Sequence, residues 1–276
     1  MRVISKPNIS PIRTYVRCYS SFIAATKINF RNITRFIGTS STDYDQKAHN
    51  KNLYTFSIHT HVQGSISKDD MVKLYNNKMV RHHTGRKIYD KLLSLAPLSR
   101  CPFCGVGTVT TLDHYLPEAK FPTFSVLPYN LVASCKDCNT GKLASYATTQ
   151  NTQTLHPYYD NFTTEQWLFA RVLQTSPVSI EFYVNPPTTW SQVDKDRVQS
   201  HFDNYKLDTR FSVEASNVLA DLREGFILFH SSPMDIQQEL HKEFMKYQSR
   251  YKNSWETALF QALYQSQWYC NRGCRL

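Results

Sequence analysis

The chain has 276 residues, of which 41% are hydrophobic, and it carries 32 Lys and Arg against 22 Asp and Glu. This length fits one large domain or two small ones, and the hydrophobic share excludes a wholly disordered chain. The net charge of +10 favours a polyanionic partner, of which nucleic acid is the commonest.

Two further classes of protein are set aside by the composition. No run approaches the roughly 18 consecutive apolar residues of a membrane-spanning helix, so we expect a soluble protein with no membrane partner. The seven cysteines are too few, and odd in number, for a secreted disulfide scaffold. Four of them form two CxxC pairs, which indicates a metal site and a cytoplasmic location.

The first 42 residues contain seven Lys or Arg and no acidic residue, a composition typical of a mitochondrial transit peptide. However, Pro7 and Pro11 are expected to interrupt any helix before Tyr15. We interpret residues 1–66 as a basic arm or short strands, and the sequence leaves open whether this region is a targeting segment. A secretory signal is not expected, since no apolar core of about 7–15 residues follows the first charges.

Residues 43–100 predict one strand and two helices. The strand covers Tyr54–His59, the first helix runs from a cap at Ser67 through Met79, and the second covers Thr84–Leu95. Ser67 is a favourable N-cap, and Asp69 and Asp70 suit the positive end of the helix dipole. Pro97 ends the second helix.

Residues 144–276 predict a polar linker, two strands and three helices. The strands are Trp167–Leu173 and Val178–Val184. Asp208, Pro233 and Ser254 mark the starts of the helices, each of which carries apolar residues at spacings near 3.6. Such stripes indicate a packed core rather than a ligand site.

The two CxxC pairs are Cys101–Cys104 and Cys135–Cys138. Each pair can place two thiolates on one tetrahedral ion, and four thiolates close a zinc site with no open position for water. The zinc is therefore expected to be structural, holding a segment too short to bury its own core. Cys18, Cys270 and Cys274 are interpreted as ordinary cysteines.

The segment between the pairs adds an ordered motif. It contains Asp113-His114-Tyr-Leu-Pro117 and then Asn130-Leu, and Cys138 is followed by Asn139-Thr-Gly-Lys142. In spacing, order and residue type, these 42 residues resemble the zinc-stapled branch of the HNH endonucleases, which share the ββα-metal motif. That branch reads CxxC, Asp-His-x-x-Pro, Asn-Leu and CxxC-Asn-x-x-Lys.

The resemblance implies a role for each polar residue. Asp113 and Asn139 would hold a divalent ion, His114 would be the general base, and Asn130 would orient the His114 ring through its other nitrogen. Asn139 stands where many relatives carry a histidine, and an amide oxygen favours Mg²⁺ or Mn²⁺. A helix that starts near Cys135 would present Asn139, with Lys142 on the same face.

The residue chemistry supports these roles independently of the family. Hydrolysis of a phosphodiester needs an activated water, a Lewis acid and stabilisation of the leaving 3′ oxygen. His114 can take a proton near neutral pH, and Asp113 offers a hard oxygen ligand. Adjacent residues on an extended segment point to opposite faces, so metal and water could lie on different sides of a bent hairpin.

Several basic residues are weaker candidates for contact with phosphate. Lys142 and His156 are the first two, and His156 lies in a Leu-His-Pro-Tyr-Tyr segment similar to those that follow the motif in some family members. Lys120, Lys136 and a cluster before the zinc module come next; the cluster consists of Lys73, Lys78, Arg81, His82, His83, Arg86 and Lys87. Solvated surface charges remain the alternative for the lysines, and a packing role remains the alternative for His156. His59 and His61 are interpreted as structural.

The sequence thus predicts an α+β fold, a ββα-metal HNH module with a four-cysteine zinc staple in a mostly helical chain. The predicted regions are an N-terminal arm (1–66), a nuclease region (67–165, core 101–143) and a helical C-terminal region (166–276). The predicted function is endonuclease cleavage of DNA, or of RNA. A weaker resemblance, to nucleases of anti-phage defence systems such as Septu, implies an ATPase or other defence partner. The alternatives are a non-catalytic zinc-containing nucleic-acid-binding or scaffold protein and a stand-alone restriction or homing nuclease.

Overall fold

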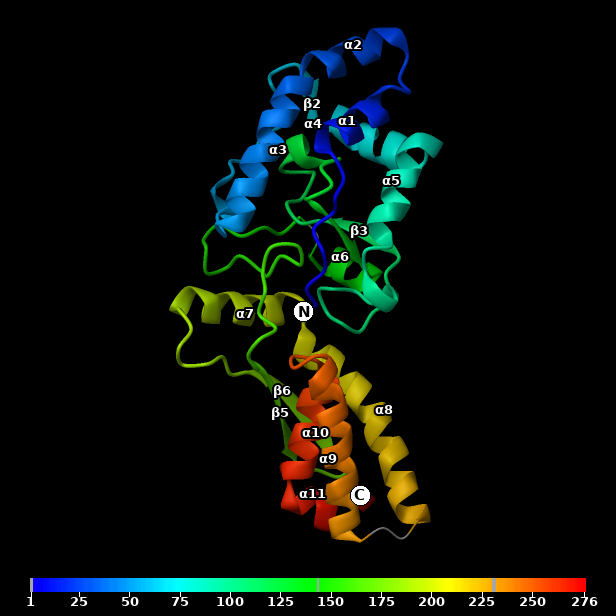
Figure 1. The fold of residues 1–276 in the computed structure, drawn as a ribbon, viewed down its shortest axis with the longest axis vertical. Helices are drawn as coiled ribbons and strands as arrows, with labels where there is room; N and C mark the ends of the chain where they lie inside the picture. Colours follow the sequence, from blue (N-terminus) through cyan, green and yellow to red (C-terminus); the bar gives the residue numbers. More distant parts are fainter. Residues whose placement is uncertain (1, 143, 230–231) are drawn as a thin grey trace. The chain divides into compact units, whose positions relative to one another are not determined.

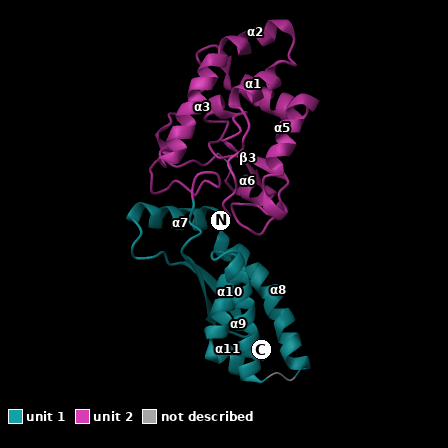
Figure 2. Cartoon of the chain, in the orientation of Figure 1, with its two compact units in different colours: residues 1, 161–276 teal, residues 2–160 magenta. Residues whose placement is uncertain are grey.

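A computed structural model describes residues 2–142, 144–229 and 232–276 of the chain. The described residues divide into two compact units, residues 2–160 and residues 161–276 (Figure 2). They form many helices and three two-stranded antiparallel sheets (Figure 1). This arrangement confirms the predicted α+β fold class.

The first unit begins with helices rather than the predicted arm or strands. These are α1 (Pro11–Tyr19), α2 (Ala24–Asn32) and α3 (Thr34–His49). The expectation that Pro11 interrupts a helix is wrong, because Pro11 is the first helical residue, where a missing N–H leaves no bond unmade. The Ser10 side chain caps the same helix by accepting from the Arg13 N–H.

The next segment matches the predicted helices but not the predicted strand. Its elements are η1 (Leu53–Thr55), β1 (His61–Val62), β2 (Ile66–Ser67), α4 (Lys68–Lys73), η2 (Leu74–Val80), α5 (His83–Leu93) and η3 (Pro97–Ser99). Tyr54–His59 is not a strand: it starts in a 3₁₀ turn and continues without a ladder partner. Ser67 is the predicted N-cap, reinforced by a capping box with Asp70. The helix then continues as a π-helical segment, η2.

A hairpin followed by a helix occupies the centre of the motif region. The hairpin pairs β3 (Thr111–His114) with β4 (Leu131–Ser134), and α6 (Lys136–Lys142) follows directly; η4 (Pro122–Phe124) lies in the connection. The register places Asp113 opposite Val132 and His114 opposite Leu131. The helix expected near Cys135 is confirmed.

The hydrophobic core of this unit joins the N-terminal helices to the hairpin. Tyr15 of α1, Leu74 of η2 and Leu92 of α5 pack in one cluster with Leu112 and Leu131 of the hairpin, and all five are nearly or fully buried. Burial of such side chains contributes about 1.5–3 kcal/mol each. The predicted boundary after residue 66 is therefore absent, because residues on both sides of it share this core.

The second unit follows the predicted pattern more closely. Its elements are β5 (Leu168–Leu173), β6 (Ser179–Val184), α7 (Gln192–Asn204), α8 (Leu207–Leu228), α9 (Pro233–Arg250), α10 (Trp255–Gln265), α11 (Gln267–Asn271) and η5 (Gly273–Arg275). The two strands pair antiparallel, and Pro233 and Ser254 start α9 and α10 as predicted. Asp208 is not a cap: α8 begins one residue earlier, after a left-handed Lys206, so Asp208 lies in the first turn.

Within the described residues, none of the helices has the length and apolar character needed to cross a bilayer.

Candidate metal centre and active site

The four motif cysteines lie together in the first unit. All four are buried, and their sulfur atoms lie within 4.8 Å of one another, with 3.9 Å between the sulfurs of Cys104 and Cys135. A tetrahedral ion with metal–sulfur bonds of about 2.3 Å requires sulfur separations of about 3.8 Å. The cluster therefore has the donor set and spacing to hold a metal ion, and both are compatible with zinc.

The backbone around the four cysteines approaches their sulfur atoms closely. The Gly107 N–H lies 3.3 Å from the Cys104 sulfur, and the Cys138 N–H lies 3.5 Å from the Cys135 sulfur. A Cβ atom at Gly107 would lie 2.7 Å from the Cys135 sulfur, so only glycine fits there. Because Cys101 and Cys104 precede β3 while Cys135 and Cys138 flank the start of α6, an ion here would join the hairpin to the helix.

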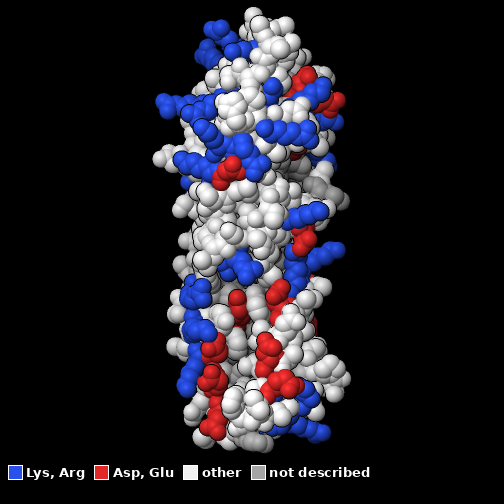
Figure 3. Space-filling view, turned by 90° about the vertical axis from the view of Figure 1, so that its right-hand side faces the viewer, with Lys and Arg blue, Asp and Glu red and all other residues white. Residues whose placement is uncertain are grey.

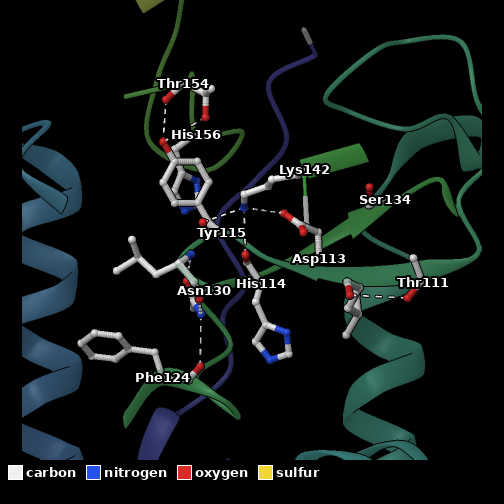
Figure 4. Close-up of polar contacts among 12 residues, drawn as sticks. Thr111, Asp113, His114, Tyr115, Phe124, Asn130, Ser134, Lys142, Thr154 and His156 are labelled. Atoms are coloured by element: carbon white, nitrogen blue, oxygen red, sulfur yellow. Dashed lines mark hydrogen bonds and ion pairs between the residues drawn. The ribbon is translucent and has the colours of Figure 1, made fainter. Parts of the chain in front are cut away.

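Asp113 lies at the interface between β3 and α6. The residue is 3% exposed, and its Oδ2 atom accepts a hydrogen bond of 2.9 Å from the Lys142 ammonium (Figure 4). Burial raises the pKa of Asp113, and the positive charge of Lys142 counteracts this rise. The result is a buried carboxylate with a cation against one oxygen.

Lys142 does not match the predicted contact with phosphate. Its ammonium donates to Asp113 and to the backbone oxygens of His114, at 2.8 Å, and Tyr115, at 2.6 Å. An ammonium has three hydrogens, so these contacts use all of them. The sequence correctly placed Lys142 near the motif, but the structure makes it an internal counter-ion that ties α6 to the end of β3.

The His114 side chain points away from Lys142, as expected for neighbours on a strand (Figure 4). Its Nε2 atom donates to the Ser125 carbonyl at 2.8 Å, and its ring packs edge-on against Tyr75 at 4.5 Å between centroids. Burial, aided by the charge of Lys142, lowers the pKa of His114 to about 4. The ring is therefore neutral at pH 7, with Nδ1 as its basic nitrogen.

Asn130 supports His114 differently from the predicted way. The expected contact with the His114 ring is absent from the described hydrogen bonds, where the Ser125 carbonyl takes that position. The buried Asn130 side chain instead accepts from the Leu116 N–H at 2.7 Å and donates to the oxygens of Leu116 and Phe124. Since Phe124 directly precedes Ser125, Asn130 fixes the loop whose carbonyl orients His114.

Asn139 lies on the helix that carries Lys142, three residues earlier and thus on the same face. Since Lys142 reaches Asp113, that face of α6 is turned toward β3. Among the described residues, no hydrogen bond joins the Asn139 side chain to Asp113. Asn139 is half-buried, and its amide remains the predicted second oxygen ligand.

His156 does not match the predicted contact with phosphate. Its side chain is 1% exposed, its Nε2 lies 3.3 Å from the Tyr44 hydroxyl and its Nδ1 accepts from the Tyr158 N–H at 3.2 Å. The ring also packs on Tyr115 at 4.2 Å between centroids. The packing role, which the sequence left as the alternative, is the one observed.

The other basic candidates divide into structural and exposed residues. His59 bonds Thr123, Lys120 lies over the Tyr146 ring, and Lys78 donates to the Ser21 carbonyl. These three have local partners within the unit. Most of the remaining cluster is exposed: Lys73 ends α4, Arg81 directly follows η2, and Lys87 lies on α5.

Three contributors to the site were not found from the sequence. They are Tyr75, Ser125 and Glu118, whose Oε2 lies 3.7 Å from the His114 Nε2. Ser125 acts through its backbone, which no side-chain pattern reveals. Glu118 follows the Asp-His-x-x-Pro segment directly, and its acidic side chain four positions after a candidate base is the one signal that points to it.

The fold is that of an α+β protein, and its first unit contains both a buried four-cysteine cluster that could hold a metal ion and an Asp-His pair. No protein-family model and no solved structure matches the chain. The protein ea31 of Escherichia phage lambda is 35% identical over 226 residues, which cover 75% of this chain and 76% of that protein. The chain therefore belongs to the family of phage lambda protein ea31.

Proposed function

We propose that the chain is a metal-dependent HNH endonuclease that hydrolyses phosphodiester bonds in DNA, with RNA as the alternative substrate. The observation that carries this proposal is the hairpin and helix β3–β4–α6. It presents a buried carboxylate and a neutral imidazole from adjacent residues, beside a four-cysteine centre. A module needed only for zinc binding gains nothing from this Asp113–His114 pair.

We propose that the four cysteines hold a structural zinc ion. A complete thiolate shell leaves no position for a water nucleophile, so this ion would not take part in hydrolysis. Its role would be to fix α6 against the hairpin, and thereby to fix Lys142 and Asn139 relative to Asp113. The orientation of the site would then depend on an ion that never contacts the substrate.

The chain's own residues suit a simple hydrolysis. His114 takes a proton from water at Nδ1 while its Nε2–H stays on the Ser125 carbonyl. The water oxygen bonds to phosphorus, the bond to the 3′ oxygen breaks, and that oxygen leaves with a proton from solvent. The products are a 5′ phosphate and a 3′ hydroxyl.

Asp113 and Asn139 would hold the catalytic divalent ion. Their oxygen donors suit Mg²⁺ or Mn²⁺, which would supply Lewis-acid stabilisation of the charge that develops on phosphate. Lys142 favours the ionised form of Asp113 and so opposes the effect of burial, because its ammonium provides a fixed positive charge at one carboxylate oxygen. Asn130 maintains the loop that orients His114.

The charge distribution agrees with a nucleic-acid substrate. Residues 2–160 carry 20 Lys and Arg against nine Asp and Glu, whereas residues 161–276 carry 12 against 13. The whole positive excess therefore belongs to the unit that contains the site. In Figure 3, most of the charged side chains on the visible face of this unit are Lys and Arg. Such a surface attracts phosphate backbones.

Plasmid cleavage with Mg²⁺ or Mn²⁺ tests the proposal. We expect His114→Ala to slow nicking by about 10²–10⁴-fold, the usual contribution of a general base. His61→Ala is the matched control, because His61 is an exposed histidine of the same unit. Equal nicking by wild type and His114→Ala would exclude His114 as the base. Absence of any nuclease activity in a zinc-loaded, folded protein would favour the non-catalytic zinc-binding alternative.

For the biological role, we propose host defence against phage together with an ATPase or other partner protein. Occurrence of a family member in a phage is compatible with competition over foreign DNA. In the second unit, a groove of about 480 Å³ between α8 and α9 offers a surface for a partner. It is lined by an apolar stripe from α8 and by Asp221, Asp235 and Glu239.

This groove suits a basic amphipathic helix on the partner. Val218, Leu222 and Phe226 repeat every four residues along α8, as one helix face does, and the acidic residues border them. Figure 3 shows Asp and Glu side chains gathered on this unit. A stand-alone restriction or homing nuclease, the remaining alternative, would have no need of such a surface.

A further inference from the structure

Helix α2 belongs to the basic N-terminal segment, which contains no acidic residue before Asp43 and which the proposed chemistry does not use. It lies at one end of the first unit (Figure 1). Phe30 is its one buried residue, and this ring stacks against Tyr19 and Phe22. The helix is therefore attached to its unit by one side and leaves most of its surface exposed.

The exposed surface of α2 combines apolar and basic side chains. Ala24, Ile28 and Arg31 follow one another at helical spacing and Lys27 lies beside Ile28, so these side chains share one face. Ile28 is 57% exposed, and Ile23, directly before the helix, is 76% exposed. Among the described residues, Lys27 and Arg31 have no ion-pair partner. Helix α2 thus presents a basic amphipathic surface that its own unit does not use.

The groove between α8 and α9 in the second unit complements this surface. Its apolar stripe consists of Val218, Leu222 and Phe226, and Asp221 and Glu239 supply negative charge beside it. At about 1.5 Å per residue, the stripe extends about 12 Å along α8, and the nine residues of α2 extend about 13.5 Å. A helix of the length of α2 can therefore contact the whole stripe.

The groove keeps its negative charge although a lysine lies beside it. Asp221 has no ion-pair partner among the described residues, and Asp235 accepts hydrogen bonds from Ser232, which carries no charge. Glu239 lies 3.8 Å from the Lys242 ammonium, but both side chains are more than half exposed, and such a pair contributes little. Three carboxylates against one ammonium leave a net negative border, which attracts the two cations of α2.

We infer that α2 of one copy of the chain occupies the α8–α9 groove of a second copy, with Ile28 on the apolar stripe and the two cations of α2 against the acidic border. The two surfaces differ, so each copy offers both halves of the contact and the association is heterologous. The inference rests on the docking role proposed for the groove but not on the proposed cleavage of DNA. Its occupant is the chain itself, because α2 is a basic amphipathic helix of the kind that the groove accommodates.

Sedimentation of the full chain at increasing concentration tests the contact. We expect wild-type protein to associate as its concentration rises. Lys27→Glu with Arg31→Glu should weaken association at least about 10-fold, because like charges then face each other. Arg81→Glu with Lys87→Glu is the matched control: it makes the same change in charge on exposed residues of the same unit outside α2, and it leaves association unchanged. A wild type that stays monomeric up to its solubility limit overturns the inference.

Mixing two variants shows which surfaces meet. The α2 variant keeps an intact groove, whereas a groove variant, Asp221→Lys with Glu239→Lys, keeps an intact α2. Each variant alone should associate at least about 10-fold more weakly than wild type. In the mixture, the basic α2 of the groove variant meets the acidic groove of the α2 variant, and association recovers. A mixture that associates as weakly as the separate variants overturns the inference.

A third measurement separates self-association from binding of nucleic acid. Ile28→Ser keeps the charge of α2 and should weaken self-association about 3–10-fold, since it removes the apolar contact. If Lys27→Glu with Arg31→Glu weakens binding of a DNA duplex but leaves sedimentation unchanged, α2 is a nucleic-acid surface and the inference is overturned. If His114→Ala cleaves like wild type, the proposed cleavage mechanism fails; sedimentation still decides what occupies the groove.

Discussion

The two units of the chain differ in where they place polar groups. Among the described residues, ten of the 13 buried polar ones lie in residues 2–160, and five of these ten belong to the β3–β4 hairpin or its connection (residues 111–134). Among the described residues of the second unit, the buried polar ones are Arg197, His201 and Thr257. Burying a polar group lowers stability unless the group finds a hydrogen-bond partner. A high number of buried polar residues in one unit therefore indicates that this unit contains the functional site.

The same contrast applies to what holds each unit together. In the first unit, the short β3–β4 hairpin and α6 are too small to be stable alone. The four cysteines that flank these elements in the sequence lie together in one cluster. In the second, α10 packs against α9 and β5, with Leu259 and Leu263 fully buried. Within the first unit, the β3–β4 hairpin and α6 are therefore expected to depend on a bound ion in addition to the hydrophobic core, whereas the second unit depends on hydrophobic burial.

The largest effect should come from removing a cysteine of the cluster. We expect Cys101→Ser or Cys138→Ser to lose bound zinc and at least about 4 kcal/mol of stability in the first unit, because structural zinc contributes folding free energy directly. Metal analysis and hydrogen exchange on the full chain, resolved by unit, measure both effects. Cys270→Ser is the matched control: it replaces a buried cysteine of the second unit and should leave the zinc content unchanged.

Full protection of residues 101–142 in the zinc-free cysteine variants would contradict this comparison. It would mean that the hairpin and α6 are held by packing alone, as in the second unit.

Local signals in the sequence were sufficient for most of the helical framework. Ser67, Pro233 and Ser254 specify helix starts through hydrogen bonds and dihedral preferences within one turn, and the structure confirms all three. Pro11 shows where such signals fail, because a proline can either break a helix or start one. The capping hydrogen bond of Ser10 decides between these outcomes.

The sequence predicted which residues belong to the site but not which hydrogen bonds they make. The sequence brings Asp113, His114, Asn130 and Lys142 to one module, and the structure places them there. Which hydrogen bond each one makes depends on side-chain reach and on backbone carbonyls. The Ser125 oxygen, not Asn130, receives the His114 Nε2–H, and the Lys142 ammonium points inward to Asp113. No residue pattern encodes these choices.

A smaller effect is expected from removing the charge of Lys142. Lys142→Met leaves the buried Asp113 carboxylate without its counter-ion and should destabilise the first unit by about 3–5 kcal/mol. Lys136→Met, an exposed lysine of the same helix, should change stability by no more than about 0.5 kcal/mol. Urea unfolding at pH 8 measures both values.

The loss of stability in Lys142→Met should depend on pH in a defined direction. Burial already raises the pKa of Asp113, and removal of Lys142 raises it further. Because the folded state then favours the protonated acid, the deficit of Lys142→Met relative to wild type should shrink as pH falls from 8 toward 5. Adding Asp113→Asn should recover part of the stability. A pH-independent deficit would show that Lys142 acts through its hydrogen bonds to the backbone instead.

The smallest effects should separate the surfaces of the two units. Neutralising Arg81 and Lys87 by substitution with Gln should weaken DNA binding and reduce the salt dependence of binding, by about one unit of log–log slope for each phosphate that is no longer neutralised. Reversing Asp221 and Glu239 to Lys, in the groove of the second unit, should leave DNA binding unweakened but abolish binding of a synthetic basic amphipathic helix. Fluorescence anisotropy with a duplex and with that peptide measures both, and an acidic amphipathic peptide is the control ligand. Each pair of substitutions changes charge on one unit alone. Weaker DNA binding by the groove variants, or peptide binding that survives in them, would contradict the proposal that the basic first unit binds nucleic acid and the acidic groove of the second unit binds a protein.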